Sequence, residues 1–290
     1  MITPQHKVSK LAAKIGLDAD LYFKREDLHP LGSHKGRSIP LMIKKYSAEG
    51  WNNFCVASSG NAALAAALTV LKMNKTKKIH VGLTIFAGKK INKIKLRALE
   101  NAAKGHGEIK IEGAANPRQR AFLAEKNGLA KNLRQSTDDL ALAGYRSLAA
   151  ELAKIKKLAA VFIPTSSGTT AQALHEAFRK SGLNPEIHIV QTQACHPMAQ
   201  CKSKAEDSIA DAIVDTVAHR KKAIAIVLKQ SGGKAWVPTD KEIKQAVAAV
   251  KDTENTETSP NGALSVAGLA LAIKKGRRFA GPVVCLITGR

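Results

Sequence analysis

The chain has 290 residues, 44% of them hydrophobic and 4% aromatic, and its 46 Lys and Arg against 23 Asp and Glu give a formal net charge of +23. This length is enough for one large core or two modest ones. No apolar run reaches the roughly 20 residues that a membrane helix needs, and the first residues lack the apolar stretch of a signal peptide. We therefore expect a cytoplasmic protein without a membrane partner.

The basic residues are spread along the chain and are not gathered into an arm. The sequence has no zinc-finger spacing and no aromatic RNA-binding motif, and its aromatic residues are too sparse for base stacking. We expect no specific nucleic-acid partner. A diffuse basic surface would attract polyanions without selectivity or favour an anionic substrate.

The cysteines do not predict a metal site or a disulfide framework. Cys55, Cys195, Cys201 and Cys285 show no CxxC spacing. The segment CHPMAQC places His196 between two of them, but one pair of soft ligands without a second pair is a weak signal for zinc. Buried or incidental thiols and no metal are the expectation.

Strand-like runs rich in β-branched residues alternate with helix-like runs rich in Ala, Leu and Lys. Helical patterns cover residues 118–128, which end at Gly128, residues 136–157, and residues 239–251, which have the capping-box spacing of Thr239 and Glu242. This alternation predicts an α/β fold in which a mostly parallel sheet is covered by helices on both faces. The expected strands are residues 21–26, 53–58, 78–85, 108–113, 160–165, 186–192, 223–228 and 283–288.

Small residues gather where expected strands give way to helices, which is where α/β folds bind ligands. Residues 164–174, PTSSGTTAQAL, offer backbone N–H groups and hydroxyls that suit a phosphate. Residues 58–61, SSGN, suit a carboxylate or a ring oxygen. Lys35, in GSHKGRS, can form a Schiff base. Each also has a plainer interpretation: Lys35 as a solvated lysine, and Asn61 and residues 165–170 as helix caps.

A phosphate site, a carboxamide and an imine-forming lysine are together what pyridoxal phosphate requires of a protein. Residues 21–38, LYFKREDLHPLGSHKGRS, resemble the lysine segment of the fold-type II pyridoxal-phosphate enzymes. That group contains threonine synthase, threonine and serine dehydratases, cysteine synthase and the tryptophan synthase β subunit. SSGNAALAAAL, VFIPTSSGTTAQAL, SPNGALSVAGLALAIKKG and PVVCLITG are similar to its later segments in the same order. The resemblance runs from about residue 20 to the end of the sequence.

The resemblance implies an α/β fold of two intertwined lobes, each a mostly parallel sheet flanked by helices, with the cofactor in the cleft between them. The smaller lobe would be residues 33–147, and the larger lobe residues 1–32 and 148–290. The cofactor would be pyridoxal 5′-phosphate and the partner a small amino-acid substrate. A homodimer is compatible with this, and the oligomeric state stays open.

The resemblance also assigns roles to residues. Lys35 would carry the cofactor and move protons at the substrate α-carbon, and Asn61 would hydrogen-bond the ring hydroxyl oxygen. Thr288 would place its hydroxyl against the pyridine nitrogen. The substrate carboxylate would lie at Ser58, Ser59, Gly60 and Asn61. The cofactor phosphate would be held by Thr165, Ser166, Ser167, Gly168, Thr169 and Thr170.

The reaction implied first is that of threonine synthase, which converts O-phosphohomoserine and water to threonine and phosphate. A threonine or serine dehydratase, or a β-replacement synthase making cysteine or tryptophan, is the alternative. A non-catalytic binding protein on the same scaffold is the third hypothesis. Three departures from the group's pattern bear on the choice: His34 replaces a Phe, Gly36 replaces a common Asp, and the phosphate loop has Ser and Thr in place of a glycine run.

Overall fold

The computed structural model describes residues 2–58, 60–76, 80–88, 93–202 and 205–289. The chain divides into two compact units, Met1–His29 with Tyr145–Arg290, and Pro30–Gly144. We call these the first and the second unit. Their boundaries differ by three residues from those predicted for the two lobes.

The first unit contains a six-stranded sheet in the order β1-β2-β10-β7-β8-β9. All neighbouring strands are parallel except β1, which pairs antiparallel with β2. Because β10 lies between β2 and β7, the residues that follow these three strands meet at one edge of the sheet. The strands are β1 (Gln5–Lys7), β2 (Leu21–Arg25), β7 (Ala160–Pro164), β8 (Glu186–Val190), β9 (Ala235–Trp236) and β10 (Val283–Ile287).

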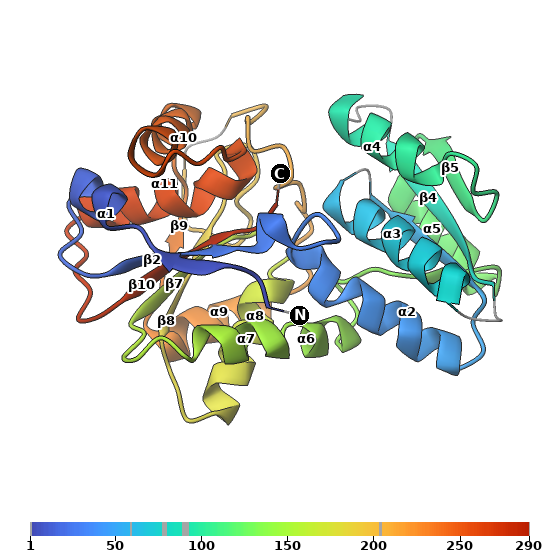
Figure 1. The fold of residues 1–290 in the computed structure, drawn as a ribbon, viewed down its shortest axis with the longest axis horizontal. Helices are drawn as coiled ribbons and strands as arrows, with labels where there is room; N and C mark the ends of the chain where they lie inside the picture. Colours follow the sequence, from blue (N-terminus) through green and yellow to red (C-terminus); the bar gives the residue numbers. More distant parts are fainter. Residues whose placement is uncertain (1, 59, 77–79, 89–92, 203–204, 290) are drawn as a thin grey trace. The chain divides into compact units, whose positions relative to one another are not determined.

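Helices cover both faces of this sheet (Figure 1). α1, α10 and α11 lie on one face, and α7, α8 and α9 lie on the other. A core of apolar side chains fills the space between the sheet and α11, and includes Phe23, Phe162 and Leu264. The helices are α1 (Ser9–Ile15), α7 (Arg146–Leu152), α8 (Thr169–Lys180), α9 (Lys221–Ser231), α10 (Asp240–Glu254) and α11 (Pro260–Lys274).

The second unit contains a parallel four-stranded sheet in the order β5-β4-β3-β6. α3 and α4 cover one face, with α2 packed on α3, and α5 covers the other (Figure 1). Met42, Phe54 and Val70 belong to its separate core. The strands are β3 (Asn53–Ala57), β4 (Gly82–Gly88), β5 (Ile109–Ala114) and β6 (Lys131–Asn132). The helices are α2 (Ile39–Ala48), α3 (Asn61–Thr76), α4 (Lys93–Ala103), α5 (Pro117–Lys126) and α6 (Leu140–Gly144).

The predicted α/β class is confirmed, but one predicted strand is wrong. Residues 223–228 lie inside helix α9, which ends at Gly232 with a left-handed φ of 74°. Ile224 and Val227, three residues apart, are buried, whereas Ile226 is 56% exposed. This spacing is helical, and it outweighs the strand propensity of the β-branched residues.

Smaller differences concern the ends of elements. The helix expected over residues 136–157 is two short helices, α6 and α7, on either side of the buried Tyr145. β4 begins at Gly82, and part of the strand expected at 78–85 lies outside the described residues. The very short strands β1, β6 and β9 were not predicted. Nowhere in the described residues is there a helix with the length and apolarity needed to cross a membrane.

Candidate active site

Lys35 lies in a tight turn of the second unit. A 3₁₀ turn over His34–Arg37 carries it, and Ser33 caps the turn by accepting a hydrogen bond from the Lys35 backbone N at 3.2 Å. The neighbouring residues Ser33, Gly36 and Arg37 are buried, and Lys35 itself is half-buried. Among the described residues no carboxylate forms an ion pair with the Lys35 ammonium. Lys35 is therefore a sheltered amine on a fixed backbone.

The turn that carries Lys35 packs against helix α3. Gly32 is the point of closest approach: it has a left-handed φ of +81°, and a Cβ built on it would lie 3.0 Å from Leu64 Cδ2 of α3. A glycine is needed there both for the backbone conformation and for the space. The second unit thus brings the Lys35 turn beside the helix that begins at Asn61.

Ser58 and Gly60 of the SSGN segment lie between the end of β3 and the start of α3. Ser58 Oγ accepts a hydrogen bond from Gly60 N at 3.3 Å, and Asn61 is the first residue of α3. Leu64 N donates to Gly60 O at 3.1 Å, which starts the helical hydrogen bonding. Ser59 lies outside the described residues. The polar groups of Ser58 and Asn61 lie after the carboxyl end of a parallel strand, which is where α/β folds bind their ligands.

The predicted phosphate loop, residues 165–170, joins β7 to α8 in the first unit. Thr165 is tied to the sheet, because its N donates to Val190 O and its Oγ1 to Ile163 O, both at 2.8 Å. Ser167 Oγ and Thr169 Oγ1 are 2.9 Å apart and share a hydrogen bond. No side chain caps α8, which begins after Gly168 in the left-handed conformation. An anion at this helix start would meet N–H groups and the positive end of the helix dipole.

Thr288 lies on the same edge of the same sheet. It follows β10 directly and is buried, with 5% of its surface exposed. β10 pairs with β7 from Val283 opposite Ala160 to Cys285 opposite Phe162. If the same register is continued past the strand ends, Thr288 lies opposite Thr165, because Thr288 and Thr165 are separated by as many residues as Val283 and Ala160. A hydroxyl and a phosphate-type loop therefore stand at the carboxyl ends of adjacent strands.

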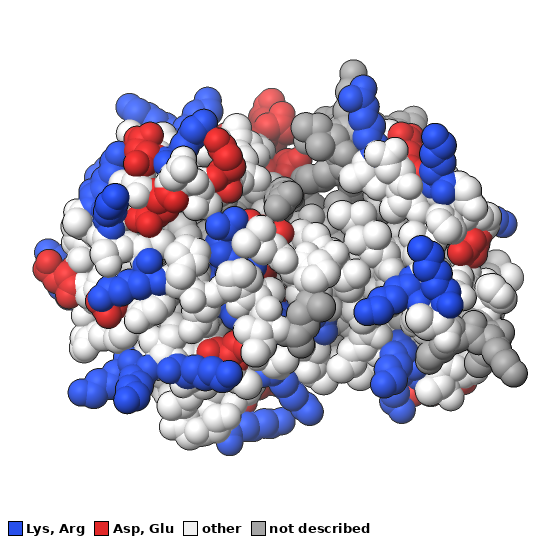
Figure 2. Space-filling view, viewed as in Figure 1, with Lys and Arg blue, Asp and Glu red and all other residues white. Residues whose placement is uncertain are grey.

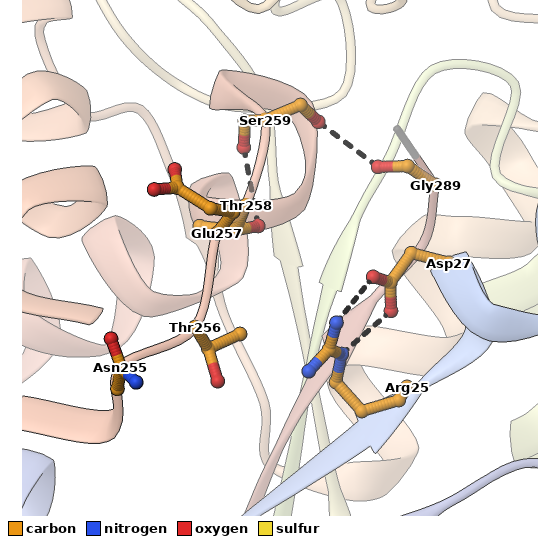
Figure 3. A pocket seen from close by; sticks show the side chains of 8 residues that line it. All are labelled: Arg25, Asp27, Asn255, Thr256, Glu257, Thr258, Ser259 and Gly289. Atoms are coloured by element: carbon orange, nitrogen blue, oxygen red, sulfur yellow. Dashed lines mark hydrogen bonds and ion pairs between the residues drawn. The ribbon is translucent and has the colours of Figure 1, made fainter. Parts of the chain in front are cut away.

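A cavity of about 570 Å³ in the first unit is lined in part by Gly289, the residue that follows Thr288 in the sequence. Figure 3 shows two fixed pairs in its wall: Arg25 with Asp27, and Ser259 with Gly289. Asp27 is almost fully buried and receives two hydrogen bonds from Arg25, at 2.7 and 2.8 Å. Hydrogen bonds between the lining residues therefore hold polar groups of the cavity wall in place. Its lining is Arg25, Asp27, Asn255, Thr256, Glu257, Thr258, Ser259 and Gly289.

The other charges of the lysine segment are structural. The buried Lys24 ammonium lies 2.5 Å from Glu151 Oε2 and donates to Thr3 O at 2.8 Å. Glu26 accepts a hydrogen bond from Thr3 Oγ1 at 2.5 Å. Sequence reasoning missed Glu151, because a partner 127 positions away leaves no local pattern.

The CHPMAQC segment has no metal-like geometry. Both ring nitrogens of His196 face backbone oxygens, those of Thr192 at 3.0 Å and Cys201 at 3.3 Å. Among the residues described, no three His, Cys, Asp or Glu side chains gather as a metal site would need.

Taken unit by unit, the predicted residues have the chemistry that one part of a phosphorylated aromatic aldehyde would need, with hydroxyls in the first unit and a primary amine in the second. The phosphate loop contains hydroxyls and no carboxylate, and Thr288 supplies a buried hydroxyl one strand away. The lysine turn supplies a primary amine beside the Asn61 helix.

Comparison with known proteins points to the same group of enzymes. A family model described as pyridoxal-phosphate dependent enzyme matches residues 2–289. Threonine synthase of Methanosarcina acetivorans is 27% identical over 307 aligned residues, which cover 99% of this chain and 74% of that protein. The biosynthetic L-threonine dehydratase of Pasteurella multocida is also 27% identical, over 94% of this chain and 53% of its own length. The chain thus spans about half of that dehydratase.

Solved structures show the same fold. Serine racemase of maize superimposes with a TM-score of 0.80 at 17% identity, over 99% of this chain and 87% of the racemase. The resemblance inferred from the lysine segment and the loops that follow it is confirmed by the family match over nearly the whole sequence. The chain belongs to the pyridoxal-phosphate-dependent enzymes.

Proposed function

We propose that the protein is a threonine synthase that converts O-phosphohomoserine and water to threonine and phosphate. The observation that carries the site assignment is the packing of the Lys35 turn against α3, which begins at Asn61. The choice of reaction is supported by the similarity to the threonine synthase of Methanosarcina acetivorans over 99% of the chain. A phosphate loop built from Ser and Thr supports the same choice.

The proposed roles are those that the family resemblance implies, and the placement of the described residues supports them. Residues 165–170 hold the cofactor phosphate with backbone N–H groups and hydroxyls at the start of α8. Thr288 faces the ring nitrogen, and its neutral hydroxyl does not force protonation of that nitrogen as a carboxylate would. Asn61 donates to the ring oxygen, and Ser58, Ser59 and Gly60 receive the substrate carboxylate.

When bound, pyridoxal phosphate withdraws electrons from the carbon atoms of the attached amino acid. Lys35 is the proposed base: its amine takes a proton from the substrate α-carbon and then moves protons at the β-carbon. Of the two protons removed, one from the α-carbon and one from the β-carbon, one leaves with the phosphate that departs from the γ-carbon and the other is placed on the γ-carbon to form the methyl group. Water then adds its hydroxyl at the β-carbon and its proton at the α-carbon. The net change is one water consumed and one phosphate released for each threonine.

The net charge of +23 gives a second, weaker reason for a phosphorylated substrate. Long-range attraction would raise the rate at which a dianionic substrate reaches the protein. Such steering weakens as salt screens the charges, so kcat/KM for the phosphoester should fall with ionic strength.

A dehydratase is the second candidate, favoured by the match to the Pasteurella multocida enzyme. It would release ammonia and a 2-oxo acid from threonine or serine. Racemase and β-replacement chemistry stay as further alternatives within the same family.

One preparation distinguishes the candidates. Holoenzyme is incubated separately with O-phosphohomoserine, threonine and serine, and phosphate, threonine, ammonia and 2-oxo acid are measured. Phosphate and threonine in equal amounts from the phosphoester support the proposal. Ammonia from threonine with no action on the phosphoester shows that the dehydratase assignment is right. Lys35→Ala should abolish either activity, whereas Lys44→Ala, an exposed lysine of α2, should not.

A further inference from the structure

Residues 208–215, which we call the anchor segment, form neither helix nor strand in the first unit. A segment of this kind has no regular hydrogen bonds of its own, so its shape depends on contacts with other elements. Three such contacts hold it, one near each end and one in the middle. Between them Ala210 and Ile213 are buried in the core of the first unit.

The first contact is with the start of α10. Ser208 Oγ donates to Asp240 Oδ1 at 2.6 Å, and Ile209 N donates to Asp240 Oδ2 at 3.0 Å. Both oxygens of the Asp240 carboxylate accept a hydrogen bond, so the first two residues of the anchor segment are held against the start of α10.

The second contact is with Asn261 in the first turn of α11. Its Oδ1 accepts from Ala212 N at 2.9 Å, and its Nδ2 donates to Asp211 Oδ1 at 2.8 Å. Asn261 is 6% exposed. It lies two residues after Ser259, which donates to Gly289 O at 3.0 Å beside Thr288. The middle of the anchor segment is thus joined to the part of the unit that contains Thr288.

The third contact is with the phosphate loop. Ser166 Oγ accepts hydrogen bonds from both Val214 N and Asp215 N, each at 3.1 Å. A hydroxyl oxygen has two lone pairs, so both are engaged by the anchor segment. Only the hydroxyl hydrogen of Ser166 is left for any other acceptor.

We propose that the anchor segment holds the phosphate loop in its binding shape, and that Ser166 and Asn261 are positioning residues for the cofactor. The inference rests on the proposed role of residues 165–170. Asn261 sets the middle of the segment, and the segment in turn presents two N–H groups that fix Ser166. A substitution of Asn261, although remote from the loop in sequence, should therefore weaken the binding of the cofactor phosphate.

The test is the affinity of the cofactor-free protein for pyridoxal phosphate, measured by absorbance titration. Ser166→Ala and Asn261→Ala should each raise Kd about tenfold, because each removes two of the hydrogen bonds that join the anchor segment to its neighbours. Ser166→Thr keeps the hydroxyl and should restore affinity. Ser181→Ala and Asn184→Ala, at exposed positions after α8, are matched controls and should bind like the wild type.

Two further measurements separate positioning from direct binding. Hydrogen exchange at the Val214 and Asp215 amides should quicken in both Ser166→Ala and Asn261→Ala. The double variant should lose less affinity than the two single losses combined, because both act through one segment. Asp211→Ala, at an exposed position, removes the partner of Asn261 Nδ2 and should raise Kd even where Asn261→Ala folds poorly.

The outcomes are distinct. If the wild type binds the cofactor and all anchor variants bind it equally well, the inference is overturned and the proposed function stands. If only Ser166→Ala weakens binding, Ser166 is a direct ligand and the inference is again overturned. A wild type that binds no pyridoxal phosphate overturns the proposed function, and the inference with it.

Discussion

Gly168, in the predicted phosphate loop, has a left-handed backbone conformation that favours glycine. Its φ is +86°, and a Cβ built on it would lie 2.7 Å from Ile224 Cγ1. Gly168→Ala would combine an unfavourable left-handed conformation, of order 1 kcal/mol, with a displacement of Ile224 or of the loop. We expect Gly168→Ala to weaken pyridoxal-phosphate binding at least tenfold and to lower the melting temperature.

Gly182 provides a matched control, since it follows the other end of α8. Its φ is +72°, and no atom lies within 4 Å of a Cβ built there. Gly182→Ala should therefore lower the stability by a similar amount, since alanine is also unfavourable in a left-handed conformation, and should leave the cofactor affinity unchanged. Equal cofactor binding by Gly168→Ala and the wild type would show that the loop does not need this geometry.

Strand β8 contains a buried histidine whose surroundings favour the neutral form. His188 Nδ1 receives hydrogen bonds from Lys234 N at 3.0 Å and Trp236 Nε1 at 3.1 Å, so the ring proton lies on Nε2, which faces Glu186 at 2.8 Å. Burial lowers the pKa of His188, although the hydrogen bond to Glu186 opposes the shift. A proton added to Nδ1 would also face two N–H donors.

This arrangement predicts a loss of stability on mild acidification. The folded pKa of His188 lies below the ordinary value of 6.5, so the unfolded chain binds the proton more readily. Its contribution to stability is present above that value and is lost as pH falls from there towards the folded pKa. The urea concentration at the unfolding midpoint should therefore decrease as the pH is lowered from 7.5 to 5.5. His188→Gln should be less stable at pH 7.5 but should show a flatter pH dependence, and an identical slope in both proteins would refute this role.

The sequence predicted those elements whose pattern is local. The strands β2, β3, β5, β7, β8 and β10 were found because β-branched runs are bounded by turn residues. The Thr239–Glu242 capping box of α10 is present, with Glu242 N donating to Thr239 Oγ1 at 3.2 Å. The error at residues 223–228 arose because strand propensity was weighed without the helical spacing of Ile224 and Val227.

What could not be predicted depends on contacts between distant segments. Nothing near Lys24 in sequence indicates Glu151, and nothing near Ser166 indicates Val214 and Asp215. The candidate site residues are predictions from small-residue turns and from the family resemblance. The hydrogen bonds that support these residues could not be predicted, because they join segments that only the fold brings together.

At the scale of the whole molecule, the basic residues are spread along the sequence. Lys and Arg side chains lie singly or in small groups over the face drawn in Figure 2, with Asp and Glu between them. Several lysines are paired, such as Lys14 with Asp252 at 3.1 Å and Lys45 with Glu49 at 3.0 Å. A dispersed charge attracts polyanions without reading a sequence.

We therefore expect only weak, sequence-independent nucleic-acid binding. Fluorescence anisotropy with two unrelated DNA duplexes should give equal affinities that fall steeply between 50 and 200 mM salt, roughly in proportion to the number of phosphates contacted. Tight binding of one sequence at physiological salt would contradict this expectation.

The central claim is that Lys35 is the residue to which the cofactor is joined, and chemical trapping tests it most directly. Holoenzyme is reduced with borohydride, digested, and its peptides are mapped by mass spectrometry. We expect the reduced cofactor adduct on the peptide that contains Lys35, its loss in Lys35→Ala, and its retention in Lys44→Ala. An adduct on another lysine, or no adduct in a preparation that contains pyridoxal phosphate, would contradict the account.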